Sequence, residues 1–190
     1  MQIRHFGVTV VAYILAHGLT AMLITPLQAR LLPDVTSFAS LLYLPHGVRV
    51  LATWLLGRIA ILPLCVGAFL SEWMFAGAGI GSVTEPVILI SILVGAASAA
   101  VAFELMRAFG LNLYATERLR VHWKWLLLVG TLASVLNSVG QSLVFSGAIL
   151  PEWSVVVLVV YAVGDLLGLI ATTFILMLVF RWLRAQRAHG

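Results

Sequence analysis

The sequence predicts an all-α polytopic membrane protein: a bundle of about six transmembrane helices that forms a single domain over residues 1–190, with both termini in the cytoplasm. Hydrophobic residues make up 62% of the 190 residues, and charged residues make up only 9%. A soluble domain carries about 25% charged residues, so this chain has too few charges to cover a water-exposed surface. The bilayer must therefore be the solvent for most of the chain.

Six apolar stretches account for the spans, since each crossing takes about 20 residues. The first begins close to Met1, but it is too long for the hydrophobic region of a typical signal peptide, so we interpret it as a span. Short loops rich in glycine, proline or charged residues separate the stretches. In chain order the stretches cover residues 6–27, 36–56, 59–75, 86–109, 123–145 and 153–183.

The second stretch contains Pro45, for which two interpretations remain open. In one, the helix starts near Thr36 and Pro45 introduces a kink. In the other, the helix starts at Pro45 itself, and residues 36–44 form a re-entrant or interfacial segment. Gly57 and Arg58 then make a tight turn into the third stretch. The depth assigned to side chains after Pro45 depends on this choice.

Lysine and arginine residues are divided unequally between the two sides of the predicted bundle. Nine of the eleven fall on one side, whereas Arg30 falls on the other side with Asp34, Glu85 and Glu152. Cytoplasmic loops carry the excess of basic residues, so the basic side is predicted to be the cytoplasmic face of a bacterial inner membrane. The net charge of +4 then reflects orientation and anionic lipid, not nucleic acid. The nine are Arg4, Arg58, Arg107, Arg118, Arg120, Lys124, Arg181, Arg184 and Arg187.

Arginines at the cytoplasmic helix ends form the one sizeable charged surface of the predicted bundle. Such a surface attracts anionic headgroups, so we expect it to bind membrane lipids or an acidic segment of a partner membrane or cytoplasmic signalling protein. A homo-oligomer is compatible with the same pattern. Glu104 lies one turn before Arg107, and we expect a local ion pair between them. The residues assigned to this surface are Arg107, Arg118, Arg120, Arg181, Arg184 and Arg187.

Seven polar or ionisable residues lie in the middle or outer half of the predicted bundle, where such groups are costly and therefore mark candidate sites. Counting helix rise places three of them near the middle of the bilayer on three different helices. Two others lie one turn apart on one face of the fifth helix. The seven candidate ligand-binding residues are His17, His46, Arg49, Glu72, Asn137, Gln141 and Asp165.

These polar residues support two interpretations, which the sequence leaves open. In the first, they line a pocket that opens outward and holds a small ligand, an anion on Arg49, or a proton. In the second, they only hold helices together, with Arg49 paired to Asp165 or Glu72 and the amides bonded between helices. We expect Arg49 and Asp165 to interact, because they lie at a similar depth. Gly164 and Gly168 beside the aspartate would let the second helix approach closely.

Catalytic signatures are absent from the sequence, and we predict that the chain is not an enzyme. It contains no metalloprotease, nucleophile-elbow or phosphate-loop motif. Its five histidines are scattered. The one with an ionisable neighbour a turn away is His46, and that neighbour is Arg49, which does not ligate metals. We therefore assign no metal site, and the sequence does not indicate a cofactor. The single cysteine, Cys65, lies in an apolar run and is assigned to packing.

Four short stretches carry a likeness to a known family. They are Leu44-Pro-His-Gly-Val-Arg-Val-Leu51, Leu55-Leu-Gly-Arg58, Gly67-Ala-Phe-Leu70 and Val163-Gly-Asp-Leu-Leu-Gly168. Together they resemble the integral membrane sensor domain called MASE1. The resemblance implies a bacterial inner-membrane sensory region, which in that family is joined to a histidine kinase or a diguanylate cyclase. This chain has fewer predicted spans than the family and ends just after its last helix, so a partner protein would have to carry the output.

Three functions fit these observations. The leading one is a stand-alone MASE1-like sensory or scaffolding module that binds a small ligand or a partner membrane protein. The alternative is a structural or assembly subunit of a larger inner-membrane complex, because small residues at 95–100 and at Gly164 and Gly168 give two helices smooth faces for packing. A small-solute transporter component is the third, although the sequence shows no inverted repeat.

Overall fold

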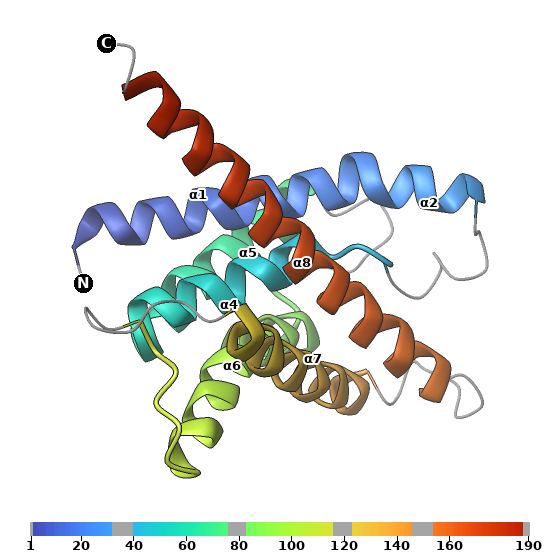
Figure 1. Ribbon diagram of the computed structural model, residues 1–190. Coiled ribbons are helices and arrows are strands. Elements are labelled where there is room, and N and C mark those ends of the chain that lie inside the picture. The colour runs from blue at the N-terminus through green and yellow to red at the C-terminus, as the bar shows by residue number, and fades with distance from the viewer. Residues whose placement is uncertain (1, 32–39, 76–82, 116–122, 146–153, 188–190) are drawn as a thin grey trace.

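The computed structural model describes residues 2–31, 40–75, 83–115, 123–145 and 154–187. Within these ranges the chain consists of helices and a few short non-helical segments, and the long helices cross one another in a bundle (Figure 1). A π-helix at Thr20–Ile24 joins α1 and α2 into one continuous rod. The α-helices are α1 (Ile3–Leu19), α2 (Thr25–Leu31), α4 (Leu44–Leu56), α5 (Ile61–Phe75), α6 (Pro86–Ala108), α7 (Trp123–Val144) and α8 (Ser154–Arg187).

Five helical segments of the described residues are long and apolar enough to cross a membrane. An all-helical chain with several such segments has the architecture of a multi-pass membrane protein, which confirms the predicted class. The sequence predicts about six spans because it counts the two helices on either side of Gly57 separately. Here Leu44–Phe75 is counted as one segment. The five segments are Ile3–Arg30, Leu44–Phe75, Pro86–Ala108, Trp123–Val144 and Val159–Val179.

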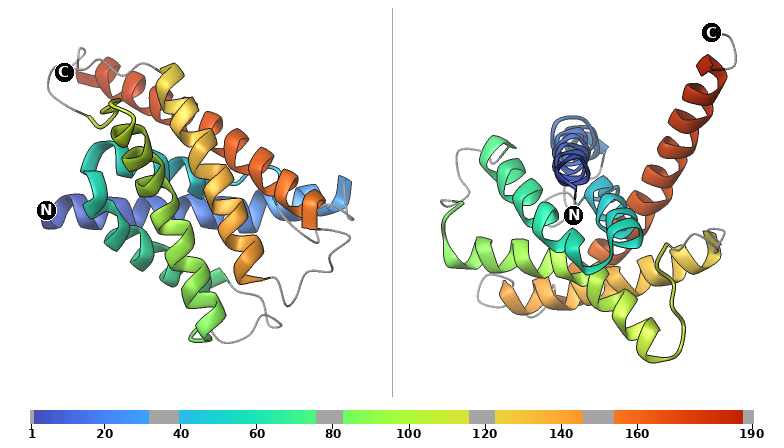
Figure 2. Two further views of the ribbon diagram at one scale, coloured as in Figure 1. Left: turned by 90° about the horizontal axis from the view of Figure 1, so that it is seen from below. Right: turned by 90° about the vertical axis from the view of Figure 1, so that its left-hand side faces the viewer.

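Gly57 interrupts the segment Leu44–Phe75. α4 ends at Leu56, and Gly57 follows with a φ of +69°, a left-handed conformation that glycine adopts without steric cost. A short 3-10 helix at Gly57–Ala60 then leads into α5, which runs back along the bundle (Figures 1 and 2). The predicted tight turn at Gly57 is therefore confirmed.

The start of α4 corrects the preferred prediction for the second stretch. α4 begins at Leu44, so a start near Thr36 is wrong, and the alternative start at Pro45 is correct to within one residue. Pro45 lies in the first turn, where its missing N–H would have no helical partner in any case, so it begins the helix rather than kinking it. Residues 40–43 approach the helix as non-helical chain, and residues 36–39 lie outside the described residues.

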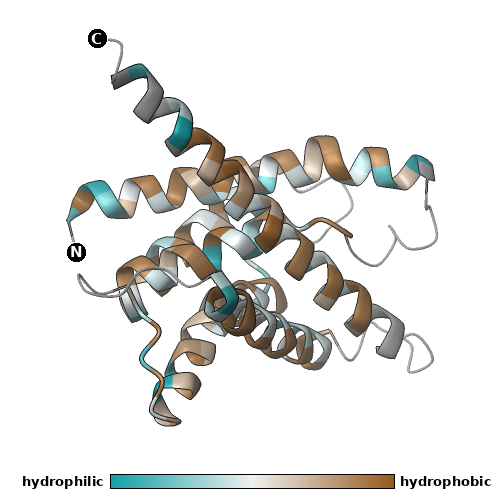
Figure 3. Cartoon of the chain, in the orientation of Figure 1, coloured by the Kyte–Doolittle hydropathy of each residue, from teal (hydrophilic) through white to brown (hydrophobic). Residues whose placement is uncertain are grey.

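The bundle has many apolar side chains on its outside, and its inside contains small and polar residues as well as an apolar core. On α1, Val8, Leu15 and Met22 are 68%, 62% and 71% exposed. The buried face of the same helix carries Thr9 and Tyr13 instead. Apolar colouring accordingly covers much of the long helices (Figure 3). In water this arrangement would be unstable, whereas in lipid the exposed aliphatic side chains face their preferred solvent.

Small residues allow the helices to approach one another closely, as predicted. Gly95, Ala96 and Ala99 lie on the buried face of α6, which packs extensively against α7. On α8, a Cβ atom at Gly164 or Gly168 would collide with backbone carbonyl groups of the chain just before α4. Glycine at both positions therefore permits the close contact between α4 and α8.

The two described ends of the chain lie at the same end of the bundle, together with the Gly57 turn (Figure 2). Beyond the other helices, the C-terminal part of α8 projects into open space (Figures 1 and 2). Basic residues concentrate at this end, and Arg30 lies at the opposite end, so the predicted charge asymmetry is present in the fold. Which side is cytoplasmic stays a prediction. The described basic residues of this end are Arg4, Arg58, Arg107, Lys124 and Arg181.

Candidate functional site: a polar cavity between the helices

The non-helical segment of residues 40–43 runs into the bundle ahead of α4 and is bonded to the helices on both sides. The Tyr43 N–H donates to the Gly164 carbonyl of α8 over 3.0 Å. The Leu44 N–H donates to the Thr20 hydroxyl of the π-helix over 3.3 Å. Irregular backbone at membrane depth is tolerated where protein groups satisfy it or where it lines a cavity. Residues 40–43 can therefore form part of the wall of a polar site.

Beside this segment lies a cavity of about 420 Å³, to which α1 and all five helices from α4 to α8 contribute lining residues. Ile88 lines it from the first turn of α6, Glu72 from near the end of α5, and Phe145 from just after α7. The cavity therefore lies in the half of the bundle away from the Gly57 turn. Five of the seven candidate residues line it: His17, Arg49, Glu72, Asn137 and Gln141.

The Arg49 guanidinium forms the cationic wall of the cavity and is only 5% exposed. Its Nη2 donates to the Tyr13 hydroxyl over 2.7 Å and to the Tyr43 hydroxyl over 3.5 Å. Its Cζ lies 5.6 Å and 5.4 Å from the centres of these two rings, within cation–π range. Gly95 of α6 makes room for the group, because a Cβ there would lie 2.6 Å from Nη2. Neutral groups thus surround the cation, and its Nε has no hydrogen-bond partner.

His17 and Glu72 are the other ionisable candidates that line the cavity. The His17 ring stacks on Phe75 with 5.9 Å between ring centres and lies 6.4 Å from Tyr13, and its buried Nδ1 has no hydrogen-bond partner. Glu72 is partly buried, and the ion pairs of the described residues do not include it. A direct pair between Arg49 and Glu72, one of the predicted alternatives, is therefore not formed.

Asn137 and Gln141 connect the cavity to the interior of the bundle. Gln141 is bonded to α6 twice: its Oε1 accepts from the Ser91 hydroxyl over 2.8 Å, and its Nε2 donates to the Ser91 carbonyl over 3.1 Å. Nε2 also reaches the Asn137 Oδ1 over 3.4 Å. Asn137 Nδ2 in turn donates to the Asp165 carboxylate of α8 over 3.0 Å. These amides therefore bond between helices, as the second of the two open interpretations describes, and they also line the cavity, as the first requires.

Asp165 pairs with His46 and not with Arg49, which corrects the expected direct interaction between Arg49 and Asp165. Both His46 and Asp165 are 0% exposed, and neither lines the cavity. His46 Nδ1 lies 3.3 Å from Asp165 Oδ2, and His46 Nε2 lies 3.1 Å from the Gly130 carbonyl oxygen of α7. Among the described residues, no ion pair joins Arg49 to a carboxylate.

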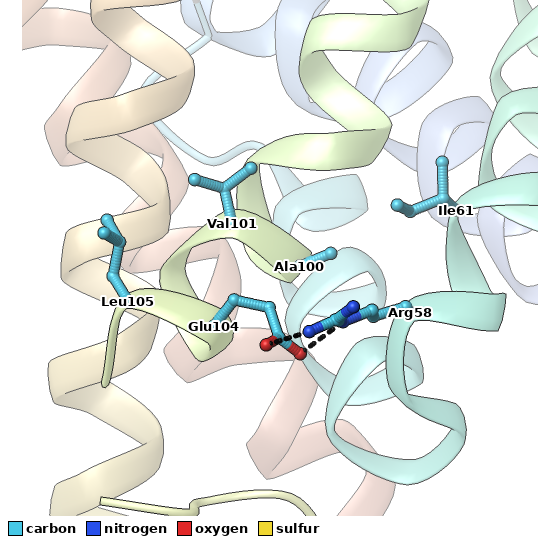
Figure 4. A pocket seen from close by; sticks show the side chains of 6 residues that line it. All are labelled: Arg58, Ile61, Ala100, Val101, Glu104 and Leu105. Carbon is cyan, nitrogen blue, oxygen red and sulfur yellow. Dashed lines mark hydrogen bonds and ion pairs between the residues drawn. The ribbon is translucent and has the colours of Figure 1, made fainter. Parts of the chain in front are cut away.

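A second hollow, of about 340 Å³, lies near the Gly57 turn (Figure 4). There Arg58 forms a two-pronged ion pair with Glu104, with Nε 2.6 Å from Oε1. Arg107 Nη1 lies 3.9 Å from the same carboxylate, so the expected local pair is present but is not the closer one. Tyr114 donates its hydroxyl to Glu104 over 2.7 Å. Partial burial and this hydrogen bond raise the pKa of Tyr114 to about 12.

The arginines assigned to lipid or partner binding are only partly described. Arg107 is 57% exposed through its side chain, and Arg181 is also exposed. Both therefore have room to contact a lipid headgroup or a partner. Arg118 and Arg120 lie outside the described residues, as do the side chains of Arg184 and Arg187.

Sequence reasoning missed the aromatic and hydroxyl groups that complete the cavity. Tyr13 and Tyr43 contact Arg49 directly, and Ser91 and Tyr161 contribute further polar groups to the lining. One signal was readable: Tyr13 lies four residues before His17, so the two side chains share one helix face. The other three residues gave no comparable signal, because a single tyrosine or serine in an apolar helix is not costly enough to attract notice.

Comparison with family models, with curated proteins and with solved structures found no match for this chain. The resemblance to MASE1 therefore stays an expectation from the sequence. The described residues contain no group of three or more histidine, cysteine, aspartate or glutamate side chains able to hold a metal ion. The functional argument accordingly rests on the cavity, its buried arginine and the polar network behind it.

Proposed function

We propose that this chain is a membrane-embedded sensory or scaffolding module that binds a small ligand in the cavity beside Arg49. The observation that supports the proposal is the convergence of polar side chains from every long helix on one cavity of about 420 Å³. Groups that served only to join helices would be expected to satisfy one another. Here the buried His17 Nδ1 and Arg49 Nε lack partners, although both side chains line the cavity.

The chemistry of the cavity favours a ligand with an anionic group. A buried arginine is expensive without a compensating anion, and the partners of Arg49 are two neutral phenols. The N-terminal end of α4, at Leu44, lies next to Tyr43 in the cavity wall and adds the partial positive charge of a helix N-terminus. A carboxylate-bearing molecule of modest size would satisfy the guanidinium, and the tyrosine rings offer it apolar contact.

Equilibrium binding to the full chain in lipid nanodiscs tests this proposal. The probes are benzoate and its neutral analogue benzamide, followed by the quenching of intrinsic tryptophan fluorescence. We expect saturable binding of benzoate and much weaker binding of benzamide. Arg49→Gln should abolish the difference between the two probes, and Arg58→Gln is the matched control because Arg58 lies outside the cavity. Equal benzoate binding by wild type and Arg49→Gln would refute the proposed site.

The sensory part of the proposal predicts that the chain contacts a signalling protein in the membrane or the cytoplasm. Gentle purification followed by identification of co-purifying proteins is the direct test. A kinase or cyclase would support sensing, whereas subunits of a membrane complex would support the assembly role. Neutralising Arg118 and Arg120 should weaken recovery of the partner without affecting membrane insertion, since basic residues at the membrane face attract acidic segments. Unchanged recovery would leave lipid as the sufficient ligand of this surface.

A transporter component is the second candidate, and one observation favours it. Transporters commonly build their sites from helices that are interrupted inside the membrane. Here residues 40–43 are non-helical and form part of the cavity wall just before α4. Uptake of labelled benzoate into proteoliposomes separates the two functions, because a sensor retains its ligand without moving it across the bilayer. Uptake that depends on Arg49 would favour transport.

A further inference from the structure

His46 and Asp165 form a second polar centre that the proposed ligand site does not use. Both side chains are fully buried, and neither contributes to the cavity wall. α4 supplies the histidine and α8 supplies the aspartate. Asp165 Oδ1 and His46 Nδ1 each lack a hydrogen bond that satisfies normal geometry, although Nδ1 lies 3.3 Å from Oδ2. Because the two groups are buried and this close together, only a few combinations of their protonation states are favourable.

The Gly130 carbonyl restricts the protonation of the histidine ring. A carbonyl oxygen only accepts hydrogen bonds, so at 3.1 Å His46 Nε2 must carry a hydrogen and donate it. If the ring were neutral and Asp165 ionised, the Nδ1 lone pair would then lie 3.3 Å from a carboxylate oxygen with no hydrogen between them. That arrangement is repulsive in a buried site, where water cannot screen it.

A single additional proton removes this conflict in two equivalent ways. On Nδ1 it makes an imidazolium that donates to the carboxylate, and on Oδ2 it makes a carboxylic acid that donates to a neutral ring. Both forms have no net charge, which is the inexpensive state for a buried pair. Asn137 Nδ2 donates to the same Oδ2 over 3.0 Å and is compatible with either form, because that oxygen keeps a lone pair.

The surroundings of the pair favour a neutral centre over a cationic one. Arg49 lies one turn further along α4 and already places a buried positive charge beside it. Tyr161 of α8 is the nearby titratable group on the other helix, and α7 contributes the Asn137 amide and the Gly130 carbonyl, which do not titrate. From α1, Tyr13 reaches Arg49 through its hydroxyl. A second proton would therefore add positive charge next to Arg49, and loss of the first would strand a lone pair against a carboxylate.

We propose that His46 and Asp165 are a buried proton-binding site that holds one shared proton. The ligand of this site is the proton itself, and the site is separate from the one that Arg49 offers to a small molecule. Its connection to the cavity runs through Asn137 and Gln141, which bond in sequence from Asp165 to the cavity wall. Release of the proton would place a full negative charge at the inner end of that chain of amides.

The test counts protons on the two side chains of the full protein in nanodiscs at about pH 7. Nitrogen NMR of histidine labelled with ¹⁵N reports whether His46 carries one ring hydrogen or two, and His46→Gln assigns its signal. Infrared difference spectroscopy reports a protonated carboxyl group, and Asp165→Asn assigns its band. We expect one of two results: an imidazolium with an ionised Asp165, or a neutral ring protonated at Nε2 with a protonated Asp165. The result should persist from about pH 5 to about pH 8, where a free histidine changes charge.

Two controls keep the test decisive. Glu72→Gln should leave the assigned carboxyl band unchanged, because Glu72 lies on α5 outside this centre. Should Asp165→Asn fail to insert, Asp165→Glu retains the acid and assigns the band by its shift. A neutral ring together with an ionised Asp165, or two protonated groups at once, would overturn the proposal. Either outcome bears on the proton site alone, because benzoate binding at Arg49 is measured separately.

Discussion

Replacing Gly168 by alanine tests the close approach of α8 to the chain before α4, on which both polar centres depend. A Cβ at this position would collide with the Tyr43 carbonyl oxygen, which is backbone and cannot rotate away as a side chain could. Tyr43 is also held in place, because its N–H donates to the Gly164 carbonyl over 3.0 Å. α8 and the segment of residues 40–43 must therefore move apart for the variant to fold.

The expected cost follows from two opposing effects. Overpacking of a tight contact typically costs about 1–3 kcal/mol, and partial loss of the bond between Tyr43 and Gly164 adds about 0.5–1.5 kcal/mol. In the opposite direction, alanine in place of glycine within a helix stabilises the helix by about 0.8–1 kcal/mol. Gly7→Ala isolates this last term, because a Cβ at Gly7 meets nothing within 4 Å. The stability of Gly168→Ala should therefore fall below that of Gly7→Ala by about 1.5–4.5 kcal/mol.

Unfolding of the purified protein by SDS in mixed micelles, followed by circular dichroism, measures this difference directly. Gly164→Ala should behave like Gly168→Ala, since its Cβ would collide with the Ser40 carbonyl oxygen. Benzoate binding should weaken in both variants, because Tyr43 lines the cavity. If both variants were as stable as Gly7→Ala, the close contact between α8 and residues 40–43 would be wrong, and so would the cavity wall that it forms.

Four further predictions concern pairing, surface charge, pH and topology. A double-mutant cycle between His46→Leu and Asp165→Leu should give a coupling energy of about 0.5–3 kcal/mol, because the groups are in contact and buried; additive effects would contradict the pairing. Arg58→Gln should leave the unfolding midpoint almost unchanged, because the Arg58 side chain of the ion pair with Glu104 is 65% exposed. Ultraviolet titration against Tyr114→Phe should show one phenol that ionises near pH 12. Since a free tyrosine ionises near pH 10, this group's contribution to stability is present below about pH 10 and is lost as the pH rises towards 12. Reporter fusions at positions 80 and 150 should read as periplasmic, and a cytoplasmic reading would reverse the orientation inferred from the arginines.

Composition and apolar length were sufficient to predict the class of fold. Five of the six predicted stretches match observed helices to within about four residues at each end, because lipid-facing helices are apolar over their whole length and end where charge or proline appears. The exception is the start of α4. The residues just before Leu44 are as apolar as those of a membrane-spanning helix, so hydropathy gave no reason to place the start of the helix at Leu44. Pro45 carried the right signal, since proline is common in the first turn of a helix, but the sequence alone left a kink and a helix start both open.

The non-helical segment could not be predicted from the residues that form it. The groups that stabilise its backbone are distant in the chain. Gln28 Oε1 accepts from the Leu41 N–H over 2.7 Å, and the Thr172 hydroxyl donates to the Leu44 carbonyl over 3.1 Å. Each of these polar side chains looked unremarkable in its own helix. Only the three-dimensional packing shows that they bond to the backbone of this segment and of the first residue of α4.

The pairing of Asp165 shows that the depth of a residue along its helix does not identify its partner, because the direction of the side chain around the helix also matters. Arg49 and Asp165 were matched because they lie at a similar distance along their helices, but depth leaves the direction of each side chain around its helix undetermined. An α-helix turns by about 100° per residue, so His46 and Arg49 point about 60° apart although they lie on one turn. That rotation directs His46 towards Gly130 and Asp165, on α7 and α8, and directs Arg49 towards Tyr13 of α1 and the cavity. The same turn of α4 thus directs His46 into the buried pair with Asp165 and Arg49 into the wall of the cavity, and that separation is why the proposed ligand site and the proposed proton site can be tested independently.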